Sequence, residues 1–146
     1  QAFYVDCYES MRRLRAYSTM GDRAPLYCTS VGKAILAFLP DEEIERYVGA
    51  VRLEPFTANT ITDRELLRED LRRTRERGYS VDDMEHEDGV RCVGAPLRDS
   101  EGRVVGAISV SGFAQRITRE REAEVAARVM QAAREISAAL GFGPER

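Results

Sequence analysis

Two apolar runs rich in Val, Ile and Ala, residues 90–98 and 103–112, form the clearest pattern in the chain. Between them lies the cluster Asp-Ser-Glu-Gly of residues 99–102, all of turn-forming types. Apolar runs joined by such a short polar cluster are typical of two paired strands. The segment from Gly89 to Gly112 therefore predicts an antiparallel β-hairpin with a four-residue loop.

The register of this hairpin follows if Arg98 pairs with Arg103. One face is then apolar through its middle and is expected to pack on a helix. The opposite face places Cys92 against Ser109, with Ser111 further along the same side. Such a small, hydroxyl- and thiol-bearing face predicts the floor of a polar cavity. The alternative is that both serines simply point to solvent.

Apolar residues at helical spacing predict four helices. The first begins behind Thr29 or Ser30 as N-cap and stops at Pro40. A capping-box pattern at Thr62 opens the third helix, and Thr118 is expected to cap the fourth. The second helix is expected over Asp41–Val48. The third is expected to end at Arg77, before Gly78, and the fourth at Leu140, before Gly141.

Period-two alternation predicts further strands over Ala2–Tyr8, Arg12–Thr19 and Tyr79–Glu87. The first two are expected to form a second hairpin. Antiparallel strand groups separated by helices are typical of the α+β class. We expect one domain over residues 1–146, with roughly five strands in one sheet and the first and last helices packed on it.

Charge and cysteine content narrow the function classes. The formal net charge is −3, so direct DNA binding by this chain is not expected. No apolar run approaches a membrane span and no signal peptide opens the chain, so a cytoplasmic protein is expected. The widely spaced Cys7, Cys28 and Cys92 predict free thiols. Gln1 is not an initiator methionine, and we expect a piece of a longer protein.

Candidate chemistry gathers on the polar face of the hairpin. If the strand from Tyr79 pairs beside the hairpin, that face carries Asp82, Cys92, Ser109 and Ser111. Buried hydroxyls or a carboxylate left unpaired would cost ~1–3 kcal/mol each, so this set needs a partner, water or ligand. A metabolite with a carboxylate and further oxygens would accept from the serines, while Asp82 would accept a hydroxyl or water proton.

Residues 29–33, Thr-Ser-Val-Gly-Lys, place backbone N–H groups and two hydroxyls at a helix start. Such a terminus attracts carboxylates, although ordinary capping explains the same residues. The run ends in Gly-Lys like a P-loop but lacks its first glycine and its following Ser or Thr. Nucleotide binding is therefore not expected.

Enzyme and metal functions have weak support in the residues. A dyad of Cys92 with His86, the only histidine, lacks a third group. A zinc site of Cys28, His86 and Cys92 has no standard spacing. We therefore expect no catalytic residue, no metal and no cofactor. A further alternative is a module that only self-associates through the alanine-rich last helix.

A series of motifs runs through the chain in a fixed order. Its members are Gly21, residues 25–34 (Pro-Leu-Tyr-Cys-Thr-Ser-Val-Gly-Lys-Ala), Thr57 with residues 59–62 (Asn-Thr-Ile-Thr), Arg75, Gly78, Tyr79, Asp82, residues 89–96 (Gly-Val-Arg-Cys-Val-Gly-Ala-Pro) and residues 104–112. Together they cover nearly everything from Phe3 to Gly141. This series resembles the C-terminal, effector-binding domain of the IclR family of bacterial transcription regulators.

The resemblance implies a GAF- or profilin-like fold, a curved antiparallel sheet between helices, with a pocket for a small metabolite that is commonly an organic acid. The residues that match the family's effector contacts are Ser30 and Val31 in the loop, and Asp82, Cys92, Ser109 and Ser111 in the sheet. Met84 departs from the pattern, since relatives often carry an acid there.

The resemblance also implies partners. We expect a small carboxylate effector, for which aromatic and sugar acids are two candidate classes, and self-association as a dimer or tetramer. The winged helix-turn-helix domain is N-terminal in such proteins and absent from this chain, so contact with DNA is expected only through that domain. No membrane partner is expected.

Overall fold

Strand and helix groups follow one another along the chain much as the residue pattern predicts. The computed structural model describes residues 1–9 and 20–143. The strands are β1 (Ala2–Phe3), β2 (Arg23–Ala24), β3 (Ser80–Asp83), β4 (Val90–Arg98) and β5 (Val104–Phe113), and the helices are α1 (Ser30–Leu36), α2 (Asp41–Ala50), α3 (Arg64–Arg77) and α4 (Glu122–Ala139).

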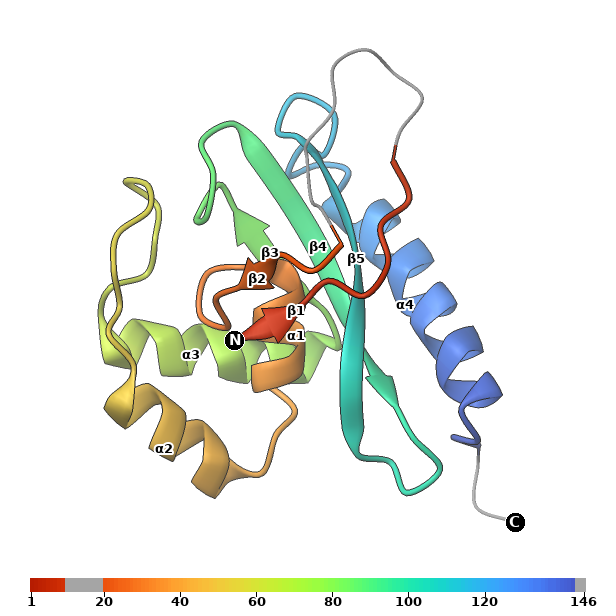
Figure 1. Cartoon of the computed structure of the whole chain (residues 1–146). Helices are drawn as coiled ribbons and strands as arrows, with labels where there is room; N and C mark the ends of the chain where they lie inside the picture. Colours follow the sequence, from red (N-terminus) through yellow and green to blue (C-terminus); the bar gives the residue numbers. More distant parts are fainter. Residues whose placement is uncertain (10–19, 144–146) are drawn as a thin grey trace.

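A three-stranded antiparallel sheet in the order β3-β4-β5 forms the centre of the structure. The long helix α4 packs on one face against β4 and β5, and α1 packs on the other face against all three strands (Figure 1). α3 contacts both α1 and α2. The α+β class and the placement of the first and last helices are therefore confirmed.

The expectation of roughly five strands in one sheet is wrong for the described residues. β1 and β2 form a separate two-stranded sheet. The strand predicted over Ala2–Tyr8 is confined to Ala2–Phe3, and Arg12–Thr19 lies outside the described residues. The strand predicted over Tyr79–Glu87 ends at Asp83, because Met84 adopts a positive φ of 59° that turns the chain.

The hairpin of β4 and β5 forms as predicted, but its register differs. Cys92 pairs with Ser111 and Gly94 pairs with Ser109, whereas the predicted register places Cys92 opposite Ser109. Side chains alternate between faces with a period of two, and the partner of Cys92 moves by two residues. The predicted polar face is therefore retained in spite of the slip.

The slip arises at the tip of the hairpin. The backbone N–H of Asp99 donates to the carbonyl of Arg103 at 3.0 Å, so the loop is shorter than predicted. Gly102 occupies the left-handed region with φ 76°, as a tight loop of this kind requires. A register irregularity between Leu97 and Arg98 supplies the rest of the offset.

Helix termini agree with the capping rules in part. Thr29, one of the two residues predicted for this role, is the N-cap of α1, and Gly78, with φ 84°, is the C-cap of α3 as predicted. The N-cap of α3 is Asp63 and not Thr62, since the Asp63 carboxylate accepts from two backbone N–H groups. Helix α4 starts beyond Thr118, whose carbonyl instead accepts the N–H of Arg121 in a turn.

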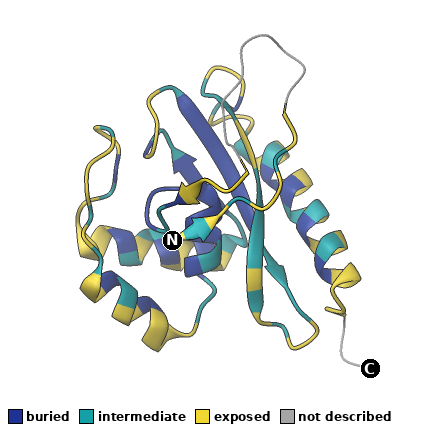
Figure 2. Ribbon diagram, viewed as in Figure 1, coloured by how far each residue is buried: buried dark blue, intermediate teal, exposed yellow. Residues whose placement is uncertain are grey.

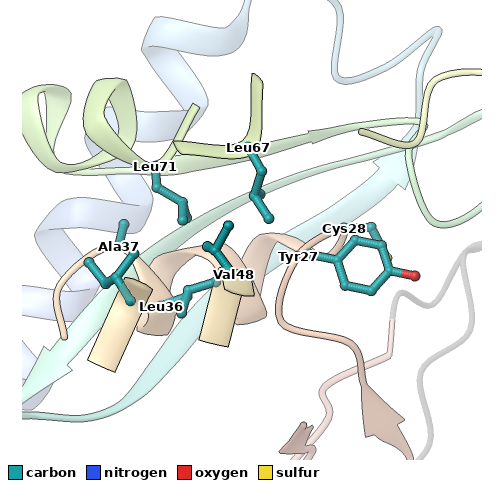
Figure 3. Packing of buried hydrophobic residues seen from close by; sticks show 8 residues of the cluster. Tyr27, Cys28, Leu36, Ala37, Val48, Leu67 and Leu71 are labelled. Carbon is teal, nitrogen blue, oxygen red and sulfur yellow. The ribbon is translucent and has the colours of Figure 1, made fainter. Parts of the chain in front are cut away.

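Apolar side chains collect in two places. One cluster lies between α1, α2 and α3 and includes Tyr27, Cys28, Leu36, Ala37, Val48, Leu67 and Leu71 (Figure 3). The other lies between α4 and the sheet, where Val93 of β4 packs with Ala126, and Ala95 packs with Val129. As a result α1 and the first half of β4 are buried from both sides (Figure 2).

Within the described ranges, no helix has the length and apolar content needed to cross a membrane.

Candidate functional site

A cavity of about 230 Å³ opens between the start of α1 and the polar face of the sheet. Its walls come from four regions of the structure. They are Tyr4, Asp22, Arg23 and Ala24 near the small sheet, Thr29 and Ser30 at α1, Asp82, His86 and Glu87 at and after β3, and Val90, Cys92 and Ser111 on the hairpin. Most of these walls are polar, and the cavity has room for a small metabolite.

The predicted site residues fall into two groups. Ser30, Asp82, Cys92 and Ser111 come together around the cavity. Ser109 lies on the same face of β5 opposite Gly94 but is not part of the cavity wall. Val31 is buried in the first turn of α1 and also does not line the cavity.

Close packing of α1 on the sheet shapes the cavity floor. A Cβ at Gly94 would lie 2.9 Å from the carbonyl oxygen of Ser30, so only glycine allows this approach. The Ser80 hydroxyl donates to the same carbonyl at 2.6 Å. The first turn of α1 is therefore held against β3 and β4.

Thr29 orders the chain just before α1. Its hydroxyl accepts the backbone N–H of Gly32 at 3.1 Å and donates to the carbonyl of Pro25 at 2.6 Å. The capping function predicted for this residue is therefore confirmed. Because that hydroxyl is already engaged twice, Ser30 is the first hydroxyl of the helix start that a ligand could use.

Asp82 is the buried acidic group of the cavity, whereas Asp22 and Glu87, which also line it, are exposed. Asp82 is only 4% exposed, and its Oδ1 accepts the backbone N–H of Glu85 at 2.7 Å. The N–H of His86 approaches the same oxygen at 3.4 Å. Burial raises the pKa of Asp82, while these backbone donors and the nearby Lys33 favour its charged form.

A buried charge cluster lies next to Asp82. The ammonium of Lys33 on α1 is fully buried and donates to Asp70 on α3 at 2.8 Å and to Glu85 at 2.6 Å. Burial, outweighing the attraction of Lys33, raises the pKa of Glu85 to about 7. Among the described residues, Glu85 Oε2 is the one buried side-chain polar atom without a hydrogen-bond partner.

The turn after β3 is clamped by the loop that follows α2. Thr57 donates to the carbonyl of Met84 at 2.6 Å, and Thr60 donates to the carbonyl of Glu85 at 2.6 Å. The ring of Phe56 lies 5.0 Å from the ring of His86, which lines the cavity. These contacts hold the turn in a conformation that is strained at Met84.

Met84 itself does not line the cavity. The Met84 side chain therefore does not contribute to the polarity of the cavity wall. Met84 acts here through its backbone, by the positive φ and by the carbonyl that Thr57 binds.

Cys92 sits at the base of the cavity as a neutral thiol. Burial raises its pKa to about 12, although contacts with Ser30 and Ser111 act in the opposite direction. A thiol that does not ionise near neutral pH is a poor nucleophile. In the ranges 1–9 and 20–143, no group of three His, Cys, Asp or Glu side chains is arranged to hold a metal ion.

The residue pattern did not reveal the cluster around Lys33. Period-two alternation places Glu85 in a strand, whereas the turn that brings it to Lys33 depends on the backbone of Met84. The sequence contains one indication of this cluster. Lys33 lies among the apolar residues Val31 and Ala34, which are buried, in a helix that carries no acidic residue to pair with it. A lysine in such a helix needs a partner from another element.

Comparison with known proteins gives consistent matches over this chain. The family described as bacterial transcriptional regulator IclR C-terminal matches residues 1–138. The HTH-type transcriptional regulator KdgR of Escherichia coli (strain K12) is 39% identical over 139 residues, which are 95% of this chain and 53% of that protein. The chain spans about half the length of the curated relatives it matches.

Solved structures of IclR-family regulators also match this chain over most of its length. The crystal structure of Thermotoga maritima IclR has a TM-score of 0.91 at 40% identity, over 96% of this chain and 57% of that one. The inducer-binding domain of PobR from Acinetobacter, a double mutant in complex with 3-hydroxybenzoic acid, has a TM-score of 0.77 at 26% identity. That match covers 86% of this chain and 73% of the PobR chain.

The curated relatives are named as transcriptional regulators or repressors and not as enzymes. This agrees with the protonated thiol of Cys92, which argues against covalent catalysis at this cavity. Family match, sequence identity and fold lead to one conclusion. The chain belongs to the IclR family of bacterial transcriptional regulators and corresponds to its C-terminal domain.

Proposed function

We propose that this domain binds a small carboxylate effector in the cavity between α1 and the sheet. The observation that carries the proposal is the convergence of Ser30, Asp82, Cys92 and Ser111 on one cavity next to the start of α1. Hydroxyl donors suit the oxygens of an organic acid, and Asp82 suits a hydroxyl group on the same molecule. An effector with both groups satisfies donors and acceptor together.

Arg23 and His86 also line the cavity, and both are exposed to solvent, as are the lining carboxylates Asp22 and Glu87. The guanidinium of Arg23 can attract the carboxylate of an effector at close range. Ser109 and Val31 do not line the cavity, so we propose them as contacts only for a larger effector.

The chemistry of one relative supports an aromatic acid. The structure of the PobR inducer-binding domain holds 3-hydroxybenzoic acid, which combines a carboxylate with a hydroxyl group. A sugar acid offers the same two groups. We therefore propose phenolic and sugar acids as the first effector classes to test.

We further propose that the effector acts on a longer protein. In that protein an N-terminal winged helix-turn-helix domain precedes this one and contacts DNA, and the protein self-associates in the cytoplasm as a dimer or tetramer. Effector binding then biases the arrangement of subunits by its differential affinity for the two arrangements. Self-association is tested by the mass in solution from light scattering, measured with and without the acid.

The binding test is a calorimetric screen of 3-hydroxybenzoate, gluconate and pyruvate. Removing one hydroxyl partner from a carboxylate costs about 1 kcal/mol or more, so Ser30→Ala and Ser111→Ala are each expected to raise the Kd about fivefold to tenfold. The matched control is Ser100→Ala at the exposed hairpin tip. Equal affinities for wild type, Ser30→Ala and Ser111→Ala would remove the effector from this cavity.

A further inference from the structure

The buried carboxylates beside the cavity have a charge imbalance that the binding function does not explain. Lys33 supplies one positive charge, whereas Asp70, Asp82 and Glu85 supply up to three negative charges around it. Glu85 is only 5% exposed, and its Oε2 has no hydrogen-bond partner. A buried carboxylate oxygen in this position is most stable when it carries a proton.

Glu85 faces charged or titratable groups from each element packed on it. Lys33 belongs to α1, Asp70 to α3 and Asp82 to β3, and the buried thiol of Cys28 precedes α1. The loop after α2 presents only the neutral hydroxyls of Thr57 and Thr60, which engage backbone carbonyls. Among the described residues, Lys33 is the one cation that forms an ion pair with Glu85.

Asp82 connects this cluster to the cavity. Its side chain lines the cavity, and its Oδ1 holds the backbone N–H of Glu85 at 2.7 Å. Asp82 also faces His86 in the following turn and the thiol of Cys92 on β4. The negative charge of Asp82 raises the pKa of Glu85. An anion that enters the cavity therefore adds a further negative charge to a group of carboxylates that already exceeds its counter-charge.

We propose that binding of a carboxylate effector is coupled to uptake of a proton by the Asp82–Glu85 pair. This inference rests on the proposed function and adds its regulation by pH. The proton comes from solvent buffer and ends on a carboxylate oxygen of the pair, so the net charge of the buried group does not become more negative. Because the two groups interact, the proton belongs to the pair and not to one residue.

The coupling sets how affinity depends on pH. Burial and the neighbouring carboxylates of Asp82 and Asp70 raise the pKa of Glu85 to about 7, so the pair exchanges its proton near neutral pH. We expect uptake of about half a proton per carboxylate bound at pH 7, rising at pH 8. By linkage, affinity falls about threefold or more between pH 7 and pH 8.

Calorimetry in two buffers measures this uptake directly. The wild-type chain is titrated with each acid that binds in the screen, 3-hydroxybenzoate first, in PIPES and in imidazole at equal pH. The difference in apparent enthalpy gives the number of protons taken from buffer. The neutral alcohol 3-hydroxybenzyl alcohol serves as the uncharged probe and is expected to bind without proton uptake.

Two variants assign the proton to this pair. Glu85→Gln cannot titrate and is expected to abolish the uptake and to flatten the pH profile of affinity. Asp70→Asn retains Glu85 but removes a charge that raises its pKa, so the uptake is expected to shift to lower pH. The matched control is Glu42→Gln on the exposed surface of α2, which is expected to behave as wild type.

The outcomes separate the two proposals. Carboxylates that bind with equal enthalpy in both buffers would overturn the proton coupling and leave the effector site standing. Failure of every carboxylate to bind would overturn the proposed function and the coupling with it. Uptake that persists unchanged in Glu85→Gln would contradict the assignment to this pair.

Discussion

The hydroxyl of Ser80 donates a 2.6 Å hydrogen bond to the carbonyl oxygen of Ser30, and this contact joins β3 to the first residue of α1. Gly94 of β4 passes beneath the same carbonyl. Two strands thus fix the height of the helix above the sheet. The depth of the cavity depends on this spacing, because Ser30, Asp82 and Cys92 line it from both layers.

Gly94→Ala tests this spacing. The new Cβ would meet the backbone of Ser30 at 2.9 Å, so either α1 or β4 has to shift, and we expect a loss of about 1–3 kcal/mol in unfolding free energy. Effector affinity should fall as well. Urea unfolding of Gly94→Ala and of the control Gly106→Ala checks this, since a Cβ at Gly106 meets nothing closer than 3.9 Å. Equal losses in the two variants would show that the close approach is unimportant.

Lys33→Met tests the buried charge cluster. The variant retains much of the side-chain volume but leaves the buried Glu85 and the half-buried Asp70 without their cation. Loss of one partner from a buried ion pair typically costs about 3–5 kcal/mol. Thermal unfolding at pH 7.5 is expected to show a large fall in Tm, whereas Arg72→Met in the exposed pairs of α3 should change it little. A double variant with Glu85→Gln should recover part of the loss.

The pH dependence of stability tests Glu85 without any ligand. Its pKa is raised from 4.5 to about 7, so the folded state holds a proton that the unfolded state releases between these values. Stability from this group is therefore lost as pH rises through this window, by about 2–3 kcal/mol from pH 5 to pH 7. Relative to wild type, Glu85→Gln should become more stable as pH increases. Parallel curves for wild type and Glu85→Gln in chemical unfolding at pH 5, 6, 7 and 8 would refute the raised pKa.

Thiol labelling tests the chemical state of Cys92. Burial raises the pKa values of Cys28 and Cys92 to about 12, whereas Cys7 is partly exposed. With iodoacetamide at pH 8 the folded protein should be alkylated at Cys7 well before the other two. Peptide mass spectrometry reads out the sites, and denatured protein supplies the control with all three labelled. Rapid alkylation of Cys92 in the folded protein would reopen a nucleophilic function for it.

The residue pattern predicted the hairpin, its polar face and the start of α1. The predicted faces are correct in spite of the error in register. A change of partner by two residues leaves the side chains of Cys92, Ser109 and Ser111 on the same face of the sheet. The residue pattern does not predict the register irregularity at Leu97 and Arg98, because it depends on how the loop closes. Local patterns are thus sufficient for faces and insufficient for pairing.

Such local patterns do not predict contacts between residues that are far apart in the sequence. Lys33 and Glu85 are separated by 52 residues, and their pairing requires α1, β3 and the strained turn at Met84 all to be in place. The clamp of that turn by Thr57 and Thr60 also crosses between distant segments. The family resemblance indicated these threonines as a motif without giving their contacts.

The most direct test of the effector site is a crystal structure of the chain with its tightest-binding carboxylate. We expect the acid in the cavity, within hydrogen-bond distance of Ser30 and Ser111 and beside Asp82. A second groove, lined by Arg75, Arg98 and Arg103, offers an anion a rival position on the described surface. Density for the acid in that groove, with the cavity beside Asp82 holding none, would contradict the proposed site.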